Sequence, residues 1–269
     1  MNNKVEKSPN NIKVRSAVRP AFLALMALLV FSVISLSACR NSGDSNNRDK
    51  TDMDTSDNNS GDLAIITAPQ LTYGLPSPKT DGGVSVEKAL ADRRSRRDFT
   101  DAPLSVEQLS QLLWAAYGTT SPEGLRTAPS AGALYPLEVY AVVGNVAGIE
   151  PGVYRYVSGE HEIVRTVEGD VRERLSAATS GQSMVGKAPV SIFYSGVFER
   201  TTQRYGERGI KYVYMELGHS AENVYLQAEA LGLGACVVGA FADNSVTELL
   251  SLPADEEPLY LMPVGFYDG

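Results

Sequence analysis

Hydrophobic residues recur along the chain at two spacings, one typical of helices and one typical of strands. Leucines and alanines at steps of three and four predict a helix that begins at Ser105 and ends at Gly118. Ser105 with Gln108 three residues later forms a capping-box pattern, which satisfies free backbone N–H groups at a helix start. A longer apolar stripe predicts a second helix, with its members at Tyr214, Leu217, Gly218, Ala221, Val224, Tyr225, Ala228 and Leu231. The small residues of this stripe allow close packing against a partner helix.

Shorter apolar runs add strands to these helices. Four runs rich in β-branched residues predict buried strands, over residues 137–143, 190–197, 236–241 and 259–264. Residues 152–167 predict a hairpin about Ser158-Gly159. Two further helices are expected, over residues 84–94 and 172–178. In the first of them, Val86 and Leu90 should face the same side as the alanines. Helices interleaved with buried strands around one sheet indicate the α+β class.

The N-terminal part of the chain has a different pattern. Five Lys or Arg residues precede an uncharged apolar run over residues 21–38, an order typical of an export signal. The run ends in Leu36-Ser37-Ala38-Cys39, which resembles the lipobox of bacterial lipoproteins. This resemblance implies cleavage before the cysteine and acylation of its thiol. Because the run is long enough to cross a bilayer, an uncleaved anchor is one alternative, and ordinary cleaved secretion is the other.

The organisation expected from this pattern has three parts. Residues 1–38 are the lipoprotein signal peptide, and residues 39–62 are the lipidated Cys39 with a polar tether too poor in apolar residues to fold. Residues 63–269 form one folded domain, about 200 residues and thus of usual size. We expect an exported protein that is held at a membrane by its lipid and faces the periplasm or the cell exterior.

The charge and the cysteine count exclude several classes of function. Loss of residues 1–38 removes five positive charges and one negative charge, so the formal charge changes from −8 to −12. Such an acidic surface argues against nucleic acid as a partner. With Cys39 acylated, Cys236 is the remaining thiol, which excludes an internal disulfide and a cysteine-based zinc site. His161 and His219 stand alone, so we expect no bound metal.

Three motifs carry candidate chemistry. The first is Arg93-Arg94-Ser95-Arg96-Arg97-Asp98-Phe99, an arginine cluster in an acidic chain. By itself it is compatible with a solvated basic face and with a phosphate site, for which guanidinium groups are well suited. The second is a turn-rich loop at residues 128–136, APSAGALYP, whose small residues let a flat group approach the backbone. The third, LGLGAC at residues 231–236, predicts a helix end at Gly232 that leads into a buried strand.

These motifs, in this order, resemble the nitroreductase family. The arginine cluster is similar to the R-x-S-x-R/K-x-F run that binds FMN, and the loop is similar to the S-A-G-A-x-Y-P signature of SagB-type dehydrogenases, which include thiazoline and oxazoline oxidases. The resemblance extends from Val84 to the end of the chain. It implies an α+β nitroreductase-like sandwich, with a central, mostly antiparallel sheet flanked by helices. It also implies a homodimer with FMN at the interface and the long helix in its core.

By position, the resemblance assigns roles to single residues. Arg93 and Ser95 would hold the phosphate and ribityl chain of FMN, and Arg97, assisted by Arg94, would reach the N1/O2 edge of the ring. A cation there stabilises the reduced, anionic flavin. Arg96 falls on an unassigned position and is expected to face solvent. The loop and the glycine-rich segment would supply the remaining flavin contacts, through Ser130, Ala131, Gly132, Gly234 and Ala235.

The resemblance also suggests the chemistry. Lys211-Tyr212 match a Lys-Tyr pair that assists proton removal in azoline oxidases, although such residues are also common at the surface of a helix start. Cys236 is expected in the core rather than as a nucleophile. We expect hydride transfer through the flavin N5 atom on a small or peptide-derived substrate. The alternatives are a reductase of nitro or quinone-type acceptors that uses NAD(P)H, and a tethered flavin- or ligand-binding module without turnover. No Lys or Arg follows Lys211, so the arginine cluster would have to neutralise the phosphate.

Overall fold

The computed structural model describes residues 70–268. The expected signal peptide, Cys39 and the tether of residues 39–62 lie outside the described residues, as do residues 63–69. The strands are β1 (Thr72–Gly74), β2 (Leu137–Val143), β3 (Gly152–Val157), β4 (Glu162–Glu168), β5 (Val190–Gly196), β6 (Gly234–Ala235) and β7 (Glu257–Gly265). The helices are α1 (Val86–Asp92), α2 (Val106–Tyr117), α3 (Arg172–Ala178), α4 (Ser183–Lys187), α5 (Glu199–Tyr205), α6 (Arg208–Ala230) and α7 (Asp243–Leu250), and a 3-10 turn spans Ala131–Ala133.

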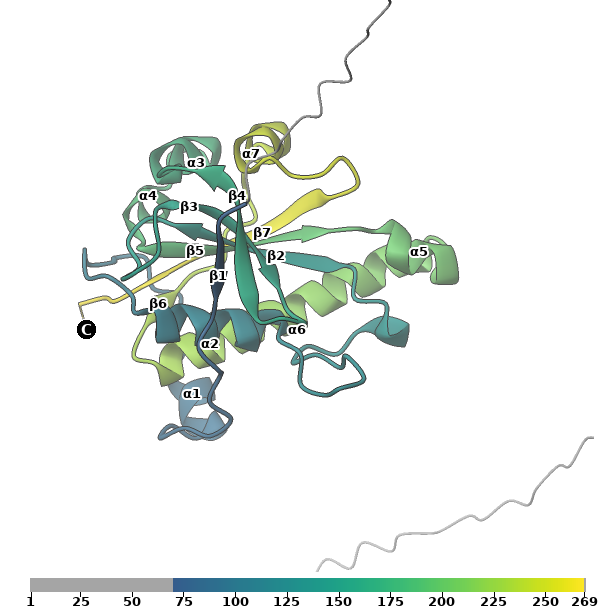
Figure 1. Cartoon of the computed structure of the whole chain (residues 1–269), viewed down its shortest axis with the longest axis horizontal. Helices are drawn as coiled ribbons and strands as arrows, with labels where there is room; N and C mark the ends of the chain where they lie inside the picture. The colour runs from purple at the N-terminus through teal and green to yellow at the C-terminus, as the bar shows by residue number, and fades with distance from the viewer. Residues whose placement is uncertain (1–69, 269) are drawn as a thin grey trace, which may run out of the picture. The chain divides into compact units, whose positions relative to one another are not determined.

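The strands form one seven-stranded sheet with helices on both faces (Figure 1). Its order is β1-β4-β3-β2-β5-β7-β6, and each pair of neighbouring strands is antiparallel. Helices α1, α2 and α6 lie on one side of the sheet, and α3, α4 and α7 lie on the other (Figure 1). The predicted α+β sandwich around an antiparallel sheet is therefore confirmed.

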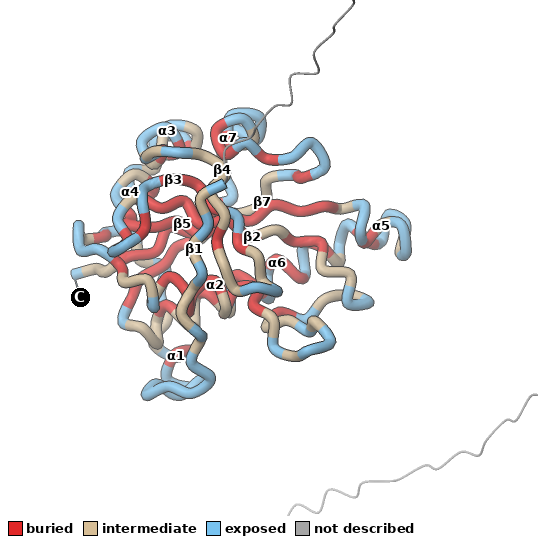
Figure 2. Tube along the Cα trace, in the orientation of Figure 1, coloured by how far each residue is buried: buried red, intermediate tan, exposed pale blue. Residues whose placement is uncertain are grey.

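Side chains of the central strands alternate between two hydrophobic cores. In β2, Val139, Ala141 and Val143 pack into the core that α2 and α6 share. Tyr140 and Val142 point the other way, into the core with α3, α4 and α7. The central strands are buried along most of their length, while the outer helices keep exposed surfaces (Figure 2). Burial on both faces explains why these strands have continuous apolar sequences.

Helix α6 is the longest element and has two unlike faces. Its inner face includes Val213, Leu217 and Val224, which are buried against the sheet and α2. On the opposite face Tyr214 and Met215 are 52% and 53% exposed, so a partly apolar surface faces solvent. Among residues 70–268 no helix combines the length and apolarity that a membrane crossing needs.

Two predictions of local structure are confirmed only in part. Helix α1 is shorter than expected, and Val86 and Leu90 are 64% and 53% exposed, so the helix buries only Ala89 against the domain. The strand predicted over residues 236–241 is not continuous, because β6 ends at Ala235 and within the predicted segment Val238 alone forms a bridge, with Leu261 of β7. The segment stays beside β7, because the N–H of Cys236 donates to Pro263 and Val238 exchanges two backbone hydrogen bonds with Leu261. The N–H of Val237 donates instead to a tyrosine hydroxyl of α6.

Candidate functional site

The arginine motif runs beside strand β6. The N–H of Arg96 donates to the carbonyl oxygen of Ala235 at 3.0 Å, and Ser95 forms a parallel bridge with Ala235. Gly234 permits this approach, because a Cβ atom there would lie 2.6 Å from the Cβ of Arg96. Two of the three motifs, far apart in the sequence, are therefore side by side.

Tyr225 of α6 joins these two segments. Its hydroxyl accepts the N–H of Val237 at 2.8 Å and lies 3.3 Å from the Oγ of Ser95. The Cζ of Arg93 lies 5.2 Å from the centroid of the same ring, a distance at which a cation is attracted to an aromatic face. The sequence placed Tyr225 on the apolar face of the helix and gave no signal for these polar contacts.

The arginines of the motif have few acidic partners. The nearest carboxylate to Arg93 is that of Glu222, at 3.9 Å. Within residues 70–268 no carboxylate forms an ion pair with the other three, Arg94, Arg96 and Arg97. Arg94 donates to the carbonyl oxygens of Ala91 and Arg93 at 3.0 and 2.7 Å and so caps the end of α1. The segment thus keeps positive charge that an anion can neutralise.

Arg96 does not face solvent as expected. Its Nε atom is buried and has no hydrogen-bond partner among the described residues. Its Cζ lies 4.5 Å from the ring centroid of Tyr267, which follows β7. A buried donor without an acceptor costs about 1–3 kcal/mol, so this nitrogen favours a ligand that brings one. A phosphate group fits the donors and the charge of this segment.

The loop at residues 128–136 lies near the other end of α6. The Oγ of Ser130 accepts the N–H of Tyr135 at 2.9 Å and closes the loop. The φ angles of Gly132, Ala133 and Tyr135 are +65°, +53° and +49°. The left-handed region costs roughly 1–2 kcal/mol for a residue that has a side chain. The loop therefore stores strain that its surroundings must offset.

A buried carboxyl group lies behind this loop. Glu216 of α6 is 2% exposed and accepts a hydrogen bond from the hydroxyl of Tyr117. Burial raises the pKa of Glu216, whereas the hydroxyls of Ser130 and Tyr117 and the charge of Arg126 favour its ionised form. The Cζ of Arg126 lies 4.2 Å from the ring centroid of Tyr117 and 4.7 Å from that of Tyr135. None of these supporting residues stands in a motif that marks it in the sequence.

Helix α5 covers the outer side of the same loop. A Cβ atom on Gly132 would lie 2.7 Å from the Oη of Tyr205 and 3.0 Å from the Nη1 of Arg204. The ring of Tyr205 packs edge-on against Tyr212, with 5.1 Å between centroids. Of the predicted catalytic pair, Tyr212 is therefore half-buried beside the loop, and Lys211 is exposed. Cys236 is buried in the second core, as predicted.

The predicted residues thus gather in two groups along α6 rather than in one. The first group comprises the arginine motif and β6, which Tyr225 joins. The loop group comprises residues 130–135 and Lys211-Tyr212, with Glu216 behind them. Because Tyr225 and Glu216 are nine residues apart on one helix, the groups are separated by about 14 Å along its axis.

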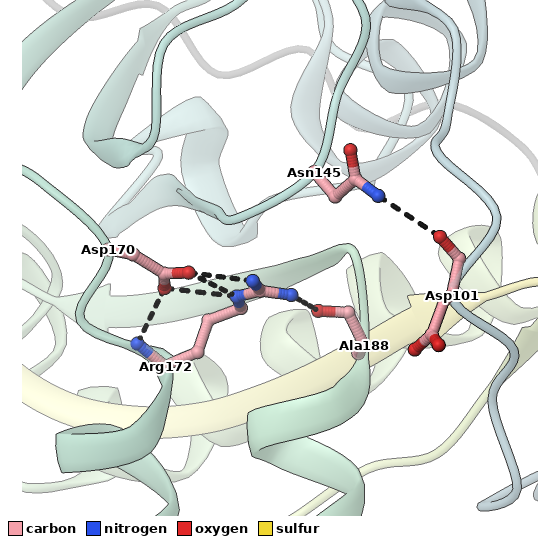
Figure 3. Close-up of polar contacts among 5 residues, drawn as sticks. All are labelled: Asp101, Asn145, Asp170, Arg172 and Ala188. Carbon is pink, nitrogen blue, oxygen red and sulfur yellow. Dashed lines mark hydrogen bonds and ion pairs between the residues drawn. The ribbon is translucent and has the colours of Figure 1, made fainter.

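A separate polar cavity of about 280 Å³ lies next to the end of the arginine motif. Arg172 is held there by Asp170, to which its Nη2 donates at 2.6 Å, and by the carbonyl oxygen of Ala188 (Figure 3). The Nδ2 of Asn145 donates to the carbonyl oxygen of Asp101 at 3.1 Å (Figure 3). The residues that line the cavity are Thr100, Asp101, Gly144, Asn145, Arg172, Lys187 and Pro189. Because Arg172 is already paired, we assign this cluster to the stability of the fold.

The sequence profile of the nitroreductase family matches residues 90–266, a span that contains both groups. The chain belongs to the nitroreductase family. A Methanocaldococcus jannaschii protein, itself named only as a candidate nitroreductase, is 47% identical over 182 residues, which are 68% of this chain and 91% of that protein. A Ralstonia eutropha structure with the same designation has a TM-score of 0.65 at 32% identity and covers 74% of this chain and 90% of that one.

Two relatives with more specific names are more distant. The microcin B17-processing protein McbC of Escherichia coli is 28% identical over 155 residues, 55% of this chain and 57% of that protein. An FMN reductase [NAD(P)H] of Bacillus subtilis is 26% identical over 197 residues, 67% of this chain and 65% of that protein. The nitroreductase family is a family of oxidoreductases, and its relatives here include both a reductase and a peptide-processing protein.

Proposed function

We propose that the protein is an FMN-dependent oxidoreductase of the SagB-type branch, which transfers hydride between the flavin N5 atom and a small or peptide-derived substrate. The observation that carries the proposal is the arginine motif beside the glycine-rich strand β6, where Arg94, Arg96 and Arg97 have no ion pair within residues 70–268 and a buried guanidinium nitrogen of Arg96 lacks an acceptor there. The similarity to the Bacillus subtilis FMN reductase supports FMN as the cofactor.

In this proposal, different residues bind different parts of the cofactor. Arg93 and Ser95 hold the phosphate and the ribityl chain, and Arg97 approaches the ring. The segment at Gly234-Ala235 and the loop at residues 130–132 contact the isoalloxazine. FMN, when bound, supplies a hydride acceptor that a cation at the N1/O2 edge makes more oxidising. Lys211 and Tyr212, the second of which packs beside the loop, would assist removal of the proton that leaves the substrate.

We further propose a homodimer, because one face of α6 leaves apolar side chains exposed. Tyr214 and Met215 are more than half exposed, and a Cβ atom on Gly218 would meet nothing within 4 Å. Exposed apolar area of this kind favours association. We propose that a second copy of the chain packs on this face.

Two directions of hydride transfer are candidates for this protein. The S-A-G-A-x-Y-P loop and the similarity to McbC favour oxidation of a peptide-derived ring. The similarity to the Bacillus subtilis reductase favours NAD(P)H as donor to nitro or quinone-type acceptors. In either case we propose that the domain acts outside the cytoplasm, held through Cys39, and acquires its flavin there.

The first experiment tests the cofactor site. We expect Arg93→Ala with Arg97→Ala to weaken FMN binding by the purified full-length chain about 100-fold or more, because two charged hydrogen-bond donors are lost. Fluorescence quenching of added FMN measures the affinity. Arg174→Ala with Lys187→Ala, which removes two exposed charges of α3 and α4, is the matched control and should leave the affinity unchanged. Near wild-type affinity in the first double variant would refute the site.

The second measurement separates the candidate activities. Bleaching of the flavin absorbance under anaerobic NADH or NADPH supports the reductase, and bleaching by a thiazoline peptide that is converted to a thiazole supports the dehydrogenase. Flavin that binds but is reduced by neither compound identifies a binding module and contradicts the proposed enzyme.

A further inference from the structure

The least expected ionisable group in the molecule is the carboxyl of Glu216. It is 2% exposed and lies on the inner face of α6, one turn beyond Tyr212. A buried carboxyl destabilises a fold unless neighbouring groups hydrogen-bond to it. The groups that face Glu216 are the hydroxyls of Tyr117 and Ser130, the guanidinium of Arg126 and the imidazole of His219. These neighbours come from α2, from the loop and its approach, and from α6 itself.

Each of the two hydroxyls that face Glu216 also accepts a hydrogen bond from a backbone N–H at or just after the end of the loop. The Oγ of Ser130 accepts the N–H of Tyr135 at 2.9 Å, and the hydroxyl of Tyr117 accepts the N–H of Leu137 at 3.4 Å. An ionised carboxylate only accepts hydrogen bonds, so it draws both hydroxyl protons toward itself. The lone pairs of both oxygens are then free for the backbone N–H groups. One carboxylate therefore sets two hydroxyls to receive the end of the loop.

The loop needs such support because its backbone is strained. Ala133 and Tyr135 have φ angles of +53° and +49°, values that residues with side chains rarely adopt. Such conformations persist when several surrounding contacts fix them, and they concentrate at functional sites. Arg126 adds to the restraint, since its guanidinium lies over the rings of both Tyr117 and Tyr135.

We propose that Glu216 is a positioning residue that holds the loop at residues 130–135 in its left-handed form through Ser130 and Tyr117. In this form the loop presents its backbone to the flavin ring. The proposal rests on the proposed function, because it takes the loop to be a flavin contact. Glu216 itself does not touch the cofactor or the substrate.

The test compares two ligands that share the ring and differ in the phosphate. Fluorescence quenching gives the dissociation constants of FMN and of riboflavin for the full-length chain freed of flavin. In Glu216→Gln, which replaces one acceptor oxygen by an NH2 donor and removes the negative charge, we expect both ligands to bind roughly tenfold more weakly. The factor should be the same for both ligands, because the loop contacts the part that they share. A loss confined to FMN, or no loss, would overturn the proposal.

Glu256 provides a matched control. It is also buried, at 7% exposure, and it accepts hydrogen bonds from two hydroxyls, those of Tyr140 and Ser195. These partners belong to β2 and β5 rather than to the loop. Glu256→Gln should therefore lower stability without changing the affinity for either flavin. Equal weakening in both glutamine variants would show a general effect of removing a buried charge and would contradict the specific role of Glu216.

A second variant keeps the test decisive if Glu216→Gln does not fold. Ser130→Ala alone should weaken FMN and riboflavin by one common factor, and a loss confined to FMN, or no loss, would refute the proposed contact. Where Glu216→Gln does fold, adding Ser130→Ala should weaken binding little further, because both changes break one chain of contacts. Additive losses would refute the coupling. If the wild-type chain binds neither flavin, the proposed function fails; if it binds both and Glu216→Gln and Ser130→Ala bind them equally well, this inference alone fails.

Discussion

The two ends of α6 organise their surroundings in different ways. At the Tyr225 end, two extended segments are joined by hydrogen bonds, and three of the four arginines of the motif have no ion pair within the part of the chain that the structure describes. At the Glu216 end, a strained loop is held by hydroxyls, an arginine and a buried carboxyl. The first end offers charge for an anion, and the second offers a fixed backbone shape. One helix therefore presents two unlike surroundings, one defined by charge and one by backbone conformation.

The largest effect should come from filling space at the loop end. Gly132→Ala puts a side chain on a residue with φ of +65° and forces Tyr205 and Arg204 of α5 away. We expect the free energy of unfolding to fall by about 3 kcal/mol from backbone strain and overpacking together. Urea denaturation of the full-length chain measures it, and flavin affinity should fall as well.

Gly148→Ala is the matched control for that change. Gly148 has a φ angle of +80°, but a Cβ atom there would meet nothing within 4 Å. The control should therefore lose only the conformational part, about 1 kcal/mol. If the two alanine variants lose equal stability, the contact between the loop and α5 contributes nothing, and the loop end is not fixed as described.

An intermediate effect is expected at the other end of the helix. Tyr225→Phe leaves the N–H of Val237 without its acceptor and releases Ser95. FMN affinity should fall roughly tenfold, with a smaller loss for riboflavin, because Ser95 lies at the phosphate end. The control is Tyr260→Phe, because the hydroxyl of Tyr260 has no hydrogen bond among the described residues. If Tyr225→Phe weakens the binding of FMN and of riboflavin equally, the Tyr225 end does not act on the phosphate part of the cofactor, and the proposed difference between the two ends is refuted.

Local sequence signals predicted most of the fold. The capping box of Ser105 and Gln108 and the Gly118 cap are present as expected, and the hairpin of β3 and β4 turns at the predicted place. The failures depend on contacts distant in sequence. The segment after β6 pairs with β7 at Val238 but forms no continuous strand, and α5 was not predicted because its largely polar sequence buries only Thr201. An apolar pattern such as that of α1 does not say whether it faces the domain or another molecule.

The site was predictable to the extent that its residues stand in motifs. The arginine cluster, the loop and the glycine-rich segment are contiguous, so the sequence indicated them. Glu216 and Tyr225 are single residues of a long helix whose importance arises from partners on other elements. One signal was available for Glu216, because it lies three residues after Val213 and so falls on the buried face of α6. A charged residue at such a position predicts a buried interaction.

The smallest effect is a pH dependence that distinguishes the two buried glutamates. Burial raises the pKa of both Glu216 and Glu256 above the value of 4.5 expected for an exposed glutamate. The folded state therefore favours the protonated carboxyl, and each contribution to stability is present below pH 4.5 and is lost as the pH rises through the raised pKa. Relative to the matching glutamine variant, the wild-type chain should therefore lose stability as the pH rises through this window.

Flavin affinity should follow only one of these titrations. The neighbours of Glu216 favour its ionised form, in which it can orient Tyr117 and Ser130, so FMN affinity should increase as the pH rises through the pKa of Glu216. Glu216→Gln should abolish the increase, and Glu256→Gln should preserve it, because the partners of Glu256 lie outside the loop. Binding titrations of the full-length chain across this pH range measure both slopes. If the FMN affinity of Glu216→Gln still increases with pH, another group causes the pH dependence, and the proposal that Glu216 positions the loop is contradicted.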